Sequence, residues 1–580
     1  MTVFKSEIRD GMRIDWDVPV TMDDGLTLRA DIFRPVAEGR YPVLMTYGPY
    51  GKGLAFQEGY KTAWDIMARE NPDVLAGSTN QYQNWEVVDP EKWVPDGYVC
   101  IRVDSRGAGR SPGFLSHNNR RETRDFHQCI EWAAVQPWAN GKVGLNGISY
   151  YASNQWRAAA SQPPHLAAIC AWEGWNDAYR ESHRHGGIAC TFRKNWQEMQ
   201  VKTVQHGVGE RGKKHPVTGE LACGPETLSE AELANNREDM WLAVLGRETD
   251  SEWYRERSAD LSRVTVPLLS ASNWGGQGLH PRGNFEGYVG AASKQKWLEV
   301  HGGSHWAPFY TDYGVGLQKR FFDHFLKGAA NGWDQQPGVL LQVRHPGEKF
   351  VERAENEWPI ARTIWTNFYL DPAGMRLSDK APAADATLTY DAMGEGATFS
   401  TGALGHATEI TGPIALKLFV SSATVDADIF AVLRVFDPAG KEVVFQGALD
   451  PHTPIAQGWL RASHRKLDAK RTLPYRPYHT HDEKQPLSPG EVYALDVEIW
   501  PTCIVVPKGY SIALSIRGKD YEYDGEAAVL SNMKNPMKGC GPFIHDDDTD
   551  RPQAIFGGKV TLHTGPTQQA AVLLPVIPAK

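Results

Sequence analysis

Buried strands and amphipathic helices alternate between residues 41 and 172, and this order constrains the fold more than any other feature. Mostly apolar runs of strand length cover residues 41–47, 98–103, 144–148 and 166–172, and helical patterns over residues 121–136 and about 150–161 separate the last three. Such alternation is typical of a parallel sheet with right-handed crossovers, whose strands are buried on both faces. The sequence therefore predicts an α/β sheet, preceded by a hairpin of residues 15–19 and 26–33 around an Asp-Gly turn.

The α/β pattern is interrupted once and then resumes. Residues 178–261 are polar, helical in pattern and rich in Arg, Lys, Glu and His. We expect them to form a helical cap over the C-terminal edge of the sheet; the alternative is a surface excursion with no role in binding. Strand-like runs at residues 266–270 and 296–300 and a helix over residues 316–327 complete the core. The predicted α/β core is thus residues 1–177 and 262–345.

The pattern of apolar and turn-forming residues changes after residue 338. Short runs rich in Val, Ile, Phe and Tyr alternate with Pro, Gly and Asp turns, as at residues 414–420, 429–436, 493–500, 510–516 and 559–563. This spacing is typical of an all-β sandwich or jelly roll. We expect a C-terminal all-β jelly-roll domain at residues 346–580, which agrees with the roughly three domains that 580 residues suggest.

Charge and composition exclude several classes of partner. The net charge is −9 and no long basic run occurs, which argues against nucleic acids and anionic membranes. The chain has neither an apolar run of about 18 residues nor an apolar signal-peptide region at its N-terminus, so we expect a cytoplasmic enzyme. Its seven Cys are scattered and never form a C-x-x-C pair, so no disulfide framework or zinc site is predicted. No metal or cofactor is expected, and a homo-oligomer is left open.

The sharpest local feature is the sequence Gly147-Ile148-Ser149-Tyr150, between a predicted strand and a predicted helix. A nucleophilic serine on a tight strand-to-helix turn projects its hydroxyl above the sheet, and small neighbours relieve the crowding. The usual motif has a second Gly two residues after the Ser, where this chain has Tyr151. Because an isolated Gly-x-Ser arises by chance, it is the strand–turn–helix context that favours Ser149 as a nucleophile.

A serine hydroxyl needs a general base, and α/β-hydrolases place it last along the chain. His305 fits this position, in the loop that follows the strand at residues 296–300. His301 is a nearby rival that directly abuts the strand, so we expect it to be structural. The alternative for His305 is a loop histidine without a catalytic role.

These motifs resemble those of the cocaine esterase-like serine hydrolases, which are related to α-amino acid ester hydrolases, cephalosporin acylases and bacterial X-prolyl dipeptidyl peptidases. The resemblance covers nearly the whole chain. The segments that carry it are Gly147-Ile148-Ser149-Tyr150, Gly48-Pro49-Tyr50-Gly51-Lys52, Asp104-Ser105-Arg106-Gly107, Ser304-His305, Asp177-Ala178-Tyr179-Arg180, residues 321–328 and Gly458-Trp459-Leu460-Arg461.

The resemblance implies a hydrolase core, an inserted helical cap and a C-terminal jelly roll, in agreement with the pattern above. It also implies an oxyanion hole made by the hydroxyl of Tyr50 and the backbone N–H of Tyr150. One such donor is worth roughly 3–4 kcal/mol of barrier. The alternative for Tyr50 is an ordinary aromatic residue lining a pocket.

The acid of the triad departs from the family pattern. The resemblance places an Asp in the turn after the strand at residues 266–270, where this chain has Gly276. Glu173, at the end of the strand at residues 166–172, is the replacement that we expect, although it could instead bind substrate. Asp177 matches a family position outside the triad, and Asn273 could orient the imidazole only through an amide oxygen, which in a protease example costs about 10⁴ in rate.

Aromatic residues suggest pocket walls. The segment 54–93 is longer than a strand connection needs and carries Tyr82, Trp85, Glu86 and Trp93. We expect Tyr82 and Trp85 from this segment, together with Trp172 and Trp274, to line the substrate pocket.

The function predicted is an acyl-transfer hydrolase that cleaves an ester or amide through an acyl-enzyme on Ser149. Ester hydrolysis is expected over peptide hydrolysis, because no local cluster of carboxylates is evident to hold a free amino terminus. The alternatives are an X-prolyl dipeptidyl peptidase or β-lactam acylase, and a hydrolase fold that has lost catalysis and binds a glycan or a partner.

Overall fold

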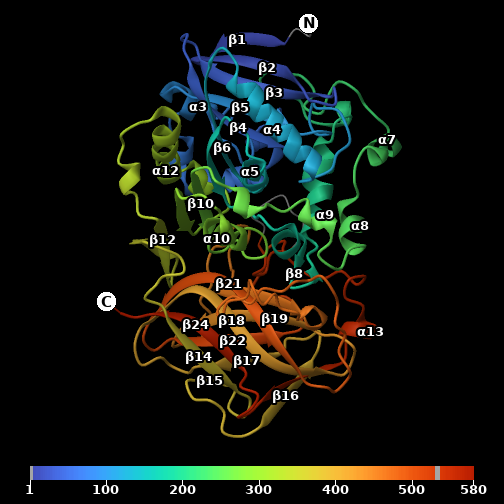
Figure 1. Ribbon diagram of the computed structural model, residues 1–580, viewed down its shortest axis with the longest axis vertical. Helices are drawn as coiled ribbons and strands as arrows, with labels where there is room; N and C mark the ends of the chain where they lie inside the picture. The colour runs from blue at the N-terminus through green and yellow to red at the C-terminus, as the bar shows by residue number, and fades with distance from the viewer. Residues whose placement is uncertain (1–3, 529–535, 580) are drawn as a thin grey trace.

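The structure is a computed structural model that describes residues 4–528 and 536–579. The first three residues of the predicted core, and residues 529–535 and 580 of the predicted β domain, lie outside the described residues. Two bodies stack along the long axis of the molecule: an α/β part that begins at the N-terminus and an all-β part below it (Figure 1).

One mixed sheet forms the α/β part, and its central strands are parallel. In the described residues its strand order is β1-β2-β3-β5-β4-β6-β7-β10-β11-β12-β13. The bounds are β1 (Lys5–Arg9), β2 (Met12–Thr21), β3 (Thr27–Pro35), β4 (Tyr41–Gly48), β5 (Val99–Asp104), β6 (Ala139–Ile148), β7 (Leu166–Trp172), β10 (Leu268–Asn273), β11 (Lys296–His301), β12 (Val339–His345) and β13 (Lys349–Glu355). The predicted hairpin, parallel strands and apolar burial are confirmed. Since β13 pairs with β12, the sheet continues past residue 345, and the domain boundaries stay predictions.

Three helices of the sheet's cover lie where the sequence predicts them: α4 (Arg120–Ala134), α5 (Tyr150–Ala160) and α12 (Asp312–Phe322). A further helix, α10 (Pro281–Gly290), connects β10 to β11. α4 begins where the side chain of Asn119 accepts a hydrogen bond from the Glu122 amide. α5 is buried along its whole length, and small alanines at its C-terminal end allow this close packing. It directly follows β6, so the loop between them lies at the C-terminal edge of the parallel strands.

The insertion after β7 contains only short helices in its described residues. They include α6 (Phe192–Trp196), α7 (Glu230–Asn235), α8 (Met240–Leu245) and α9 (Glu252–Arg255), with a small hairpin of β8 (Arg184–His185) and β9 (Ile188–Ala189). Buried ion pairs, rather than long amphipathic helices, hold the insertion in position. For example, Arg184 donates to Asp550 of the all-β part at 2.8 Å. The hairpin therefore lies at the junction of the two bodies (Figure 1).

The all-β part is a barrel-like sandwich around a core of Val, Ile and Leu. Its strand order is β16-β23-β18-β21-β20-β19-β22-β17-β15-β14-β24, and a further pairing of β18 with β24 closes the sheet on itself. The bounds are β14 (Ile364–Asp371), β15 (Arg376–Ser378), β16 (Ala386–Asp391), β17 (Ala397–Ser400), β18 (Thr408–Ser422), β19 (Asp428–Phe436), β20 (Ala456–Arg461), β21 (Tyr493–Val506), β22 (Ser511–Arg517), β23 (Lys559–Thr564) and β24 (Ala571–Ile577).

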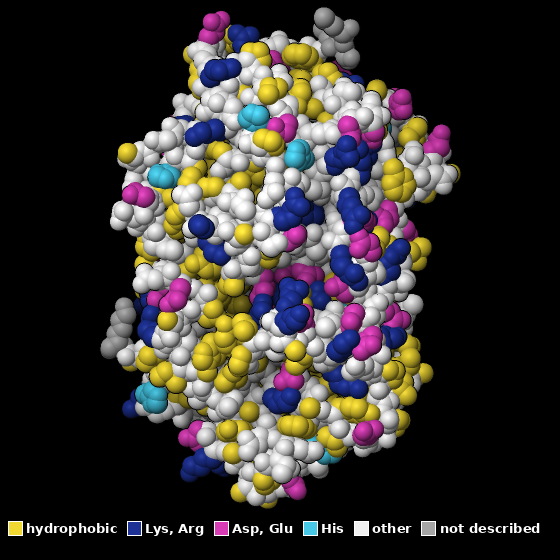
Figure 2. Space-filling view, in the orientation of Figure 1, with side chains coloured by type: hydrophobic (Ala, Val, Ile, Leu, Met, Phe, Trp, Pro, Cys, Tyr) yellow, Lys and Arg dark blue, Asp and Glu magenta, His cyan; other side chains and the backbone are white. Residues whose placement is uncertain are grey.

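Acidic and basic side chains are interspersed over the face drawn in Figure 2, with a charged cluster at the junction of the two bodies. None of the helices in the described part of the chain is both long and apolar enough to cross a membrane.

Candidate active site

Ser149 occupies a sharp turn between β6 and α5. Its φ is 58°, a left-handed conformation that a non-glycine residue adopts only under local constraint. The turn depends on close approach, because a Cβ at Gly147 would lie 2.6 Å from the Cβ of Tyr151. The structure thus places the Ser149 hydroxyl at the C-terminal edge of the sheet, as the motif predicts.

Tyr151 stands where the usual motif has glycine, and the neighbouring strand makes room for it. A Cβ at Gly48, the last residue of β4, would lie 2.6 Å from the Tyr151 ring. The ring also packs edge-on against Tyr50, at 5.7 Å between centroids. The departure from the motif is therefore compensated by a glycine on β4.

His305 and Glu173 form a buried pair beside this turn. His305 Nδ1 lies 2.6 Å from Glu173 Oε2, and the other oxygen of the carboxylate lies 3.1 Å from His301 Nε2. Burial by itself raises the pKa of Glu173, but His305 and His301 outweigh it and hold this pKa at about 2. Glu173 is therefore a carboxylate at every pH of interest and fixes the orientation of two imidazoles.

His301 is fixed from both sides. Its Nδ1 lies 2.7 Å from Glu299 and its ring stacks on Trp172 at 5.0 Å between centroids. Burial lowers the pKa of His301, but the attraction of Glu299 and the bond to Glu173 raise it to about 9. His301 thus links the Glu299 carboxylate to the Glu173 carboxylate within the buried part of the site.

The other acid candidates are engaged elsewhere. Gly276 lines the cavity but carries no side chain. The amide oxygen of Asn273 accepts from the Gly275 N–H at 2.9 Å, and its amide nitrogen donates to Glu173 and Gly303, so it does not orient His305. Asp177 caps the turn of Arg180 and forms an ion pair with that residue.

The Ser149 hydroxyl itself is bonded to a histidine that the sequence analysis does not name. Ser149 Oγ lies 3.1 Å from His280 Nε2, and the ring of His280 stacks parallel to that of His305 at 5.4 Å between centroids. Burial, and then the neighbouring His305, hold the pKa of His280 well below its usual value. His280 is therefore neutral. A signal exists in the sequence, since His280 follows the turn after β10 at the same edge of the sheet.

The Glu86 carboxylate is hydrogen-bonded to the nitrogen of His305 that faces the cavity. Its Oε1 lies 3.0 Å from His305 Nε2, and the Ser149 hydroxyl is among the groups that lower its pKa, so all three side chains are close neighbours. Burial outweighs these effects and raises the pKa of Glu86 to about 7. Glu86, Ser149 and Glu173 all have positive φ, with values of 60°, 58° and 52°, the kind of backbone strain that clusters at functional sites.

Of the two predicted oxyanion donors, Tyr50 lines the same cavity, and Tyr150 directly follows Ser149 in the chain. The Tyr50 hydroxyl accepts from Trp196 Nε1 at 3.0 Å and keeps its own hydrogen to donate. Burial, and then Glu86, raise the pKa of Tyr50 well above its usual value, so it stays protonated. Tyr150 is the first residue of α5, where a backbone N–H has no helical acceptor and the helix dipole is positive.

The cavity at this site is narrow, about 30 Å³, and draws its walls from all three parts of the chain. The insertion contributes Phe192 and Trp196, and the all-β part contributes Leu449 and Phe543. The full lining is Tyr50, Trp85, Glu86, Ser149, Phe192, Trp196, Gln200, Gly276, Leu279, His280, His305, Trp306, Ala448, Leu449 and Phe543. The insertion is thus part of the cavity wall.

Of the four aromatic residues expected in the pocket, only Trp85 lines this cavity. Trp172 is not in the lining, and its ring stacks on His301. Trp274 packs against Phe285 and Trp358, with its indole N–H bonded to the Gln342 carbonyl. Tyr82 packs against Trp16, and its hydroxyl donates to Asp10. These three placements correct the expectation: each ring is drawn away by packing partners that the sequence does not reveal.

Comparisons with known proteins match both the α/β part and the all-β part of the chain. Residues 24–307 match the model of the X-Pro dipeptidyl-peptidase (S15) family, and residues 331–538 match that of the X-Pro dipeptidyl-peptidase C-terminal non-catalytic domain. Cocaine esterase from Rhodococcus sp. is 23% identical over 97% of this chain and 98% of its own. The Xaa-Pro dipeptidyl-peptidase of Lactobacillus helveticus is 20% identical over 88% of this chain and 74% of its own.

A solved structure extends the likeness over the whole chain. The CocE/NonD family hydrolase from Staphylococcus aureus is 30% identical, covers 99% of this chain and 97% of its own, and superposes with a TM-score of 0.84. The curated relatives include both esterases and dipeptidyl peptidases. The chain therefore belongs to the CocE/NonD hydrolases, a family of serine hydrolases with an S15-type catalytic part.

Proposed function

We propose that this protein is a serine esterase that cleaves short, uncharged acyl esters through an acyl-enzyme on Ser149. The observation that carries the proposal is the pairing of His305 with the Glu173 carboxylate at 2.6 Å, beside a serine in a left-handed turn. A base held by a buried carboxylate, next to a projecting hydroxyl, is the arrangement that acyl transfer needs.

The proposed reaction runs as follows. With His305 in its neutral form, Ser149 attacks the ester carbonyl as His305 accepts its proton, and the oxyanion is bound by the Tyr50 hydroxyl and the Tyr150 N–H. His305 then protonates the leaving alcohol, and water hydrolyses the acyl-enzyme by the same steps. His305 Nε2 is bonded to Glu86 in the resting site, so Glu86 must withdraw before the proton can move. Glu173 keeps the imidazolium stable through each transfer.

A second candidate base is His280, because it is the histidine bonded to the Ser149 hydroxyl. It is neutral and can accept a proton. However, its Nδ1 has no hydrogen-bond partner among the described residues, so no hydrogen bond at that nitrogen stabilises the imidazolium that would form. We therefore assign the base to His305 and propose that His280 holds the hydroxyl in the resting site.

The cavity favours an uncharged acyl group. Its described lining is mainly aromatic and aliphatic, and Glu86 is the only acid in it. The carboxylate of Glu86 is already bonded to His305, so it offers no unpaired negative charge to a free amino terminus. Dipeptidyl peptidases must bind that ammonium group, so ester substrates with short acyl chains fit better.

The experiment that tests this function compares p-nitrophenyl acetate, p-nitrophenyl octanoate and glycyl-prolyl p-nitroanilide. We expect kcat/KM for the acetate to exceed that for the dipeptide substrate by at least about 100-fold, the scale on which a missing polar partner discriminates substrates. The octanoate is expected to be a poorer substrate than the acetate, because the cavity is narrow. Efficient release from glycyl-prolyl p-nitroanilide would instead identify a dipeptidyl peptidase.

Glu86→Gln is expected to move the acid limb of the pH profile to lower pH. Burial lowers the pKa of His305, but Glu173 and then Glu86 outweigh it and raise this pKa to about 10. A base works only above its own pKa. Removing the charge of Glu86 lowers the pKa of His305, so a larger fraction is neutral at a given pH. The measurement is kcat/KM for p-nitrophenyl acetate across the pH range.

The matched control for this change is Glu131→Gln. Glu131 is bonded to a histidine outside the cavity, with 2.7 Å between its Oε2 and His165 Nδ1, so the change also removes a carboxylate from an imidazole. Its profile is expected to overlay that of the wild type. An acid limb that stays in place in Glu86→Gln would show that this carboxylate does not control the base.

A further inference from the structure

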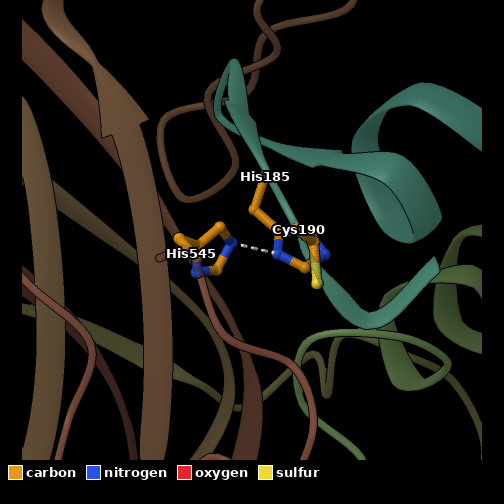
Figure 3. A group of neighbouring side chains, drawn as sticks. All are labelled: His185, Cys190 and His545. Carbon is orange, nitrogen blue, oxygen red and sulfur yellow. Dashed lines mark hydrogen bonds between the residues drawn. The ribbon is translucent and has the colours of Figure 1, made fainter. Parts of the chain in front are cut away.

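Three potential metal ligands meet at the junction of the insertion and the all-β part. His185 and Cys190 come from the β8–β9 hairpin and the residue after it, and His545 comes from the C-terminal part (Figure 3). One ligand atom from each lies within 4.8 Å of the others, and all three residues are at most 1% exposed. The cluster lies outside the lining of the catalytic cavity.

When both rings are neutral, the two imidazoles face each other through nitrogens that carry lone pairs. His185 Nδ1 lies 2.8 Å from His545 Nε2, as the dashed line in Figure 3 shows. The opposite nitrogens donate outward: His185 Nε2 to the Glu181 carbonyl at 3.2 Å, and His545 Nδ1 to the Asp520 carboxylate at 2.8 Å. Two lone pairs at this distance repel unless a cation lies between them, and that cation is either an extra proton or a metal ion.

The surroundings favour a metal ion. A carboxylate that fixes the far nitrogen of a histidine, as Asp520 does, is the usual outer partner of a metal ligand. Two imidazoles and a thiol form a borderline-soft set that suits zinc. Tetrahedral zinc with nitrogens at 2.0–2.1 Å holds them about 3.3 Å apart, so binding requires the two rings to separate by about half an ångström.

A cavity with an acidic lining borders the cluster at His545. It has a volume of about 420 Å³ and is lined by more acids than bases. Its acidic lining is Asp520, Glu522, Asp546, Asp547 and Asp548. Negative side chains around an opening raise the local concentration of cations.

We propose that His185, Cys190 and His545 form a structural zinc site that ties the insertion to the all-β part. The site would also brace the catalytic cavity. Phe192 follows Cys190 by two residues and Phe543 precedes His545 by two, and these rings contact each other at 5.1 Å within the cavity wall. This site goes beyond the proposed esterase function and does not depend on it.

The test is metal uptake by the full chain after treatment with a chelator and dialysis. With Co²⁺ as the probe, we expect one ion per chain and a thiolate-to-cobalt charge-transfer band in the near ultraviolet. Zn²⁺ is expected to displace the cobalt and to raise the thermal unfolding temperature. Cys190→Ser is expected to lose the charge-transfer band, and Cys223→Ser, a buried cysteine elsewhere in the insertion, to keep it.

A third variant tests the outer partner. Asp520→Asn leaves the three ligands in place and is expected to weaken Zn²⁺ binding by about 10–100-fold. Wild-type protein that takes up no stoichiometric Co²⁺ or Zn²⁺ would overturn the proposal and assign a shared proton to the two histidines. The same conclusion follows if Cys190→Ser binds Co²⁺ with an unchanged spectrum. The wild-type measurement decides the matter even if a variant fails to fold.

Discussion

Replacing Ser149 with alanine is expected to reduce kcat for p-nitrophenyl acetate by about 10⁵–10⁶-fold, the scale seen when a catalytic serine is removed from a protease. The loss is large because no other group in the turn can form the acyl-enzyme. The measurement is steady-state hydrolysis, combined with labelling by a fluorophosphonate probe. Wild-type protein is expected to take up one probe per chain, and Ser149→Ala none.

Ser153→Ala is the matched control, because Ser153 lies one turn later on α5 and is also buried. It is expected to keep wild-type turnover and labelling. If Ser153→Ala loses as much activity as Ser149→Ala, the effect comes from damage to α5. If the wild type neither labels nor turns over esters, the hydrolase fold has lost catalysis, and a role in binding a glycan or a partner takes its place.

Glu173→Gln is expected to lower kcat by about 10³–10⁴-fold, as an acid-to-amide change in a serine protease triad does. The amide keeps the size of the side chain but removes the charge that stabilises protonated His305 and fixes its orientation. The measurement is kcat for p-nitrophenyl acetate with circular dichroism to verify folding. Glu173 lies 2.6 Å from His305, so the substitution acts directly on the base.

The control for this change is Glu299→Gln, which removes the carboxylate on the far side of His301. It is expected to cost far less, because Glu299 reaches His305 only through His301 and Glu173. The pair of variants also decides between the two candidate bases. If His280 is the base, Glu173→Gln keeps kcat within about tenfold of the wild type, since the pair that it breaks is then outside the proton path.

The local pattern of the sequence was enough to predict the elements that position the site. The apolar runs that become β6 and β7, and the turn between β6 and α5, follow from periodicity and from the need for small residues beside Ser149. Glu173 and His305 could be named because both follow parallel strands, whose carboxyl ends meet at one edge of the sheet. Their mutual distance could not be predicted, because it depends on loop conformations.

The positions of Glu86 and His280 show where such reasoning stops. Glu86 belongs to a long segment with no regular pattern, and only the folded chain places it on His305. His280 is hydrogen-bonded to Ser149 although 131 positions separate the two residues in the sequence. The prediction of the pocket aromatics fails for the same reason, because Trp274 and Trp172 pack against partners that are distant in sequence.

The sequence by itself determined the order of strands and helices, the all-β C-terminal part and the serine turn, because these depend on residues within about one or two elements of each other. Only the tertiary structure decided which carboxylate holds which imidazole, which walls close the cavity, and that His185, Cys190 and His545 meet. Those contacts join segments separated by more than one hundred residues. Their energy depends on distances of a few ångströms, which periodicity and spacing do not encode.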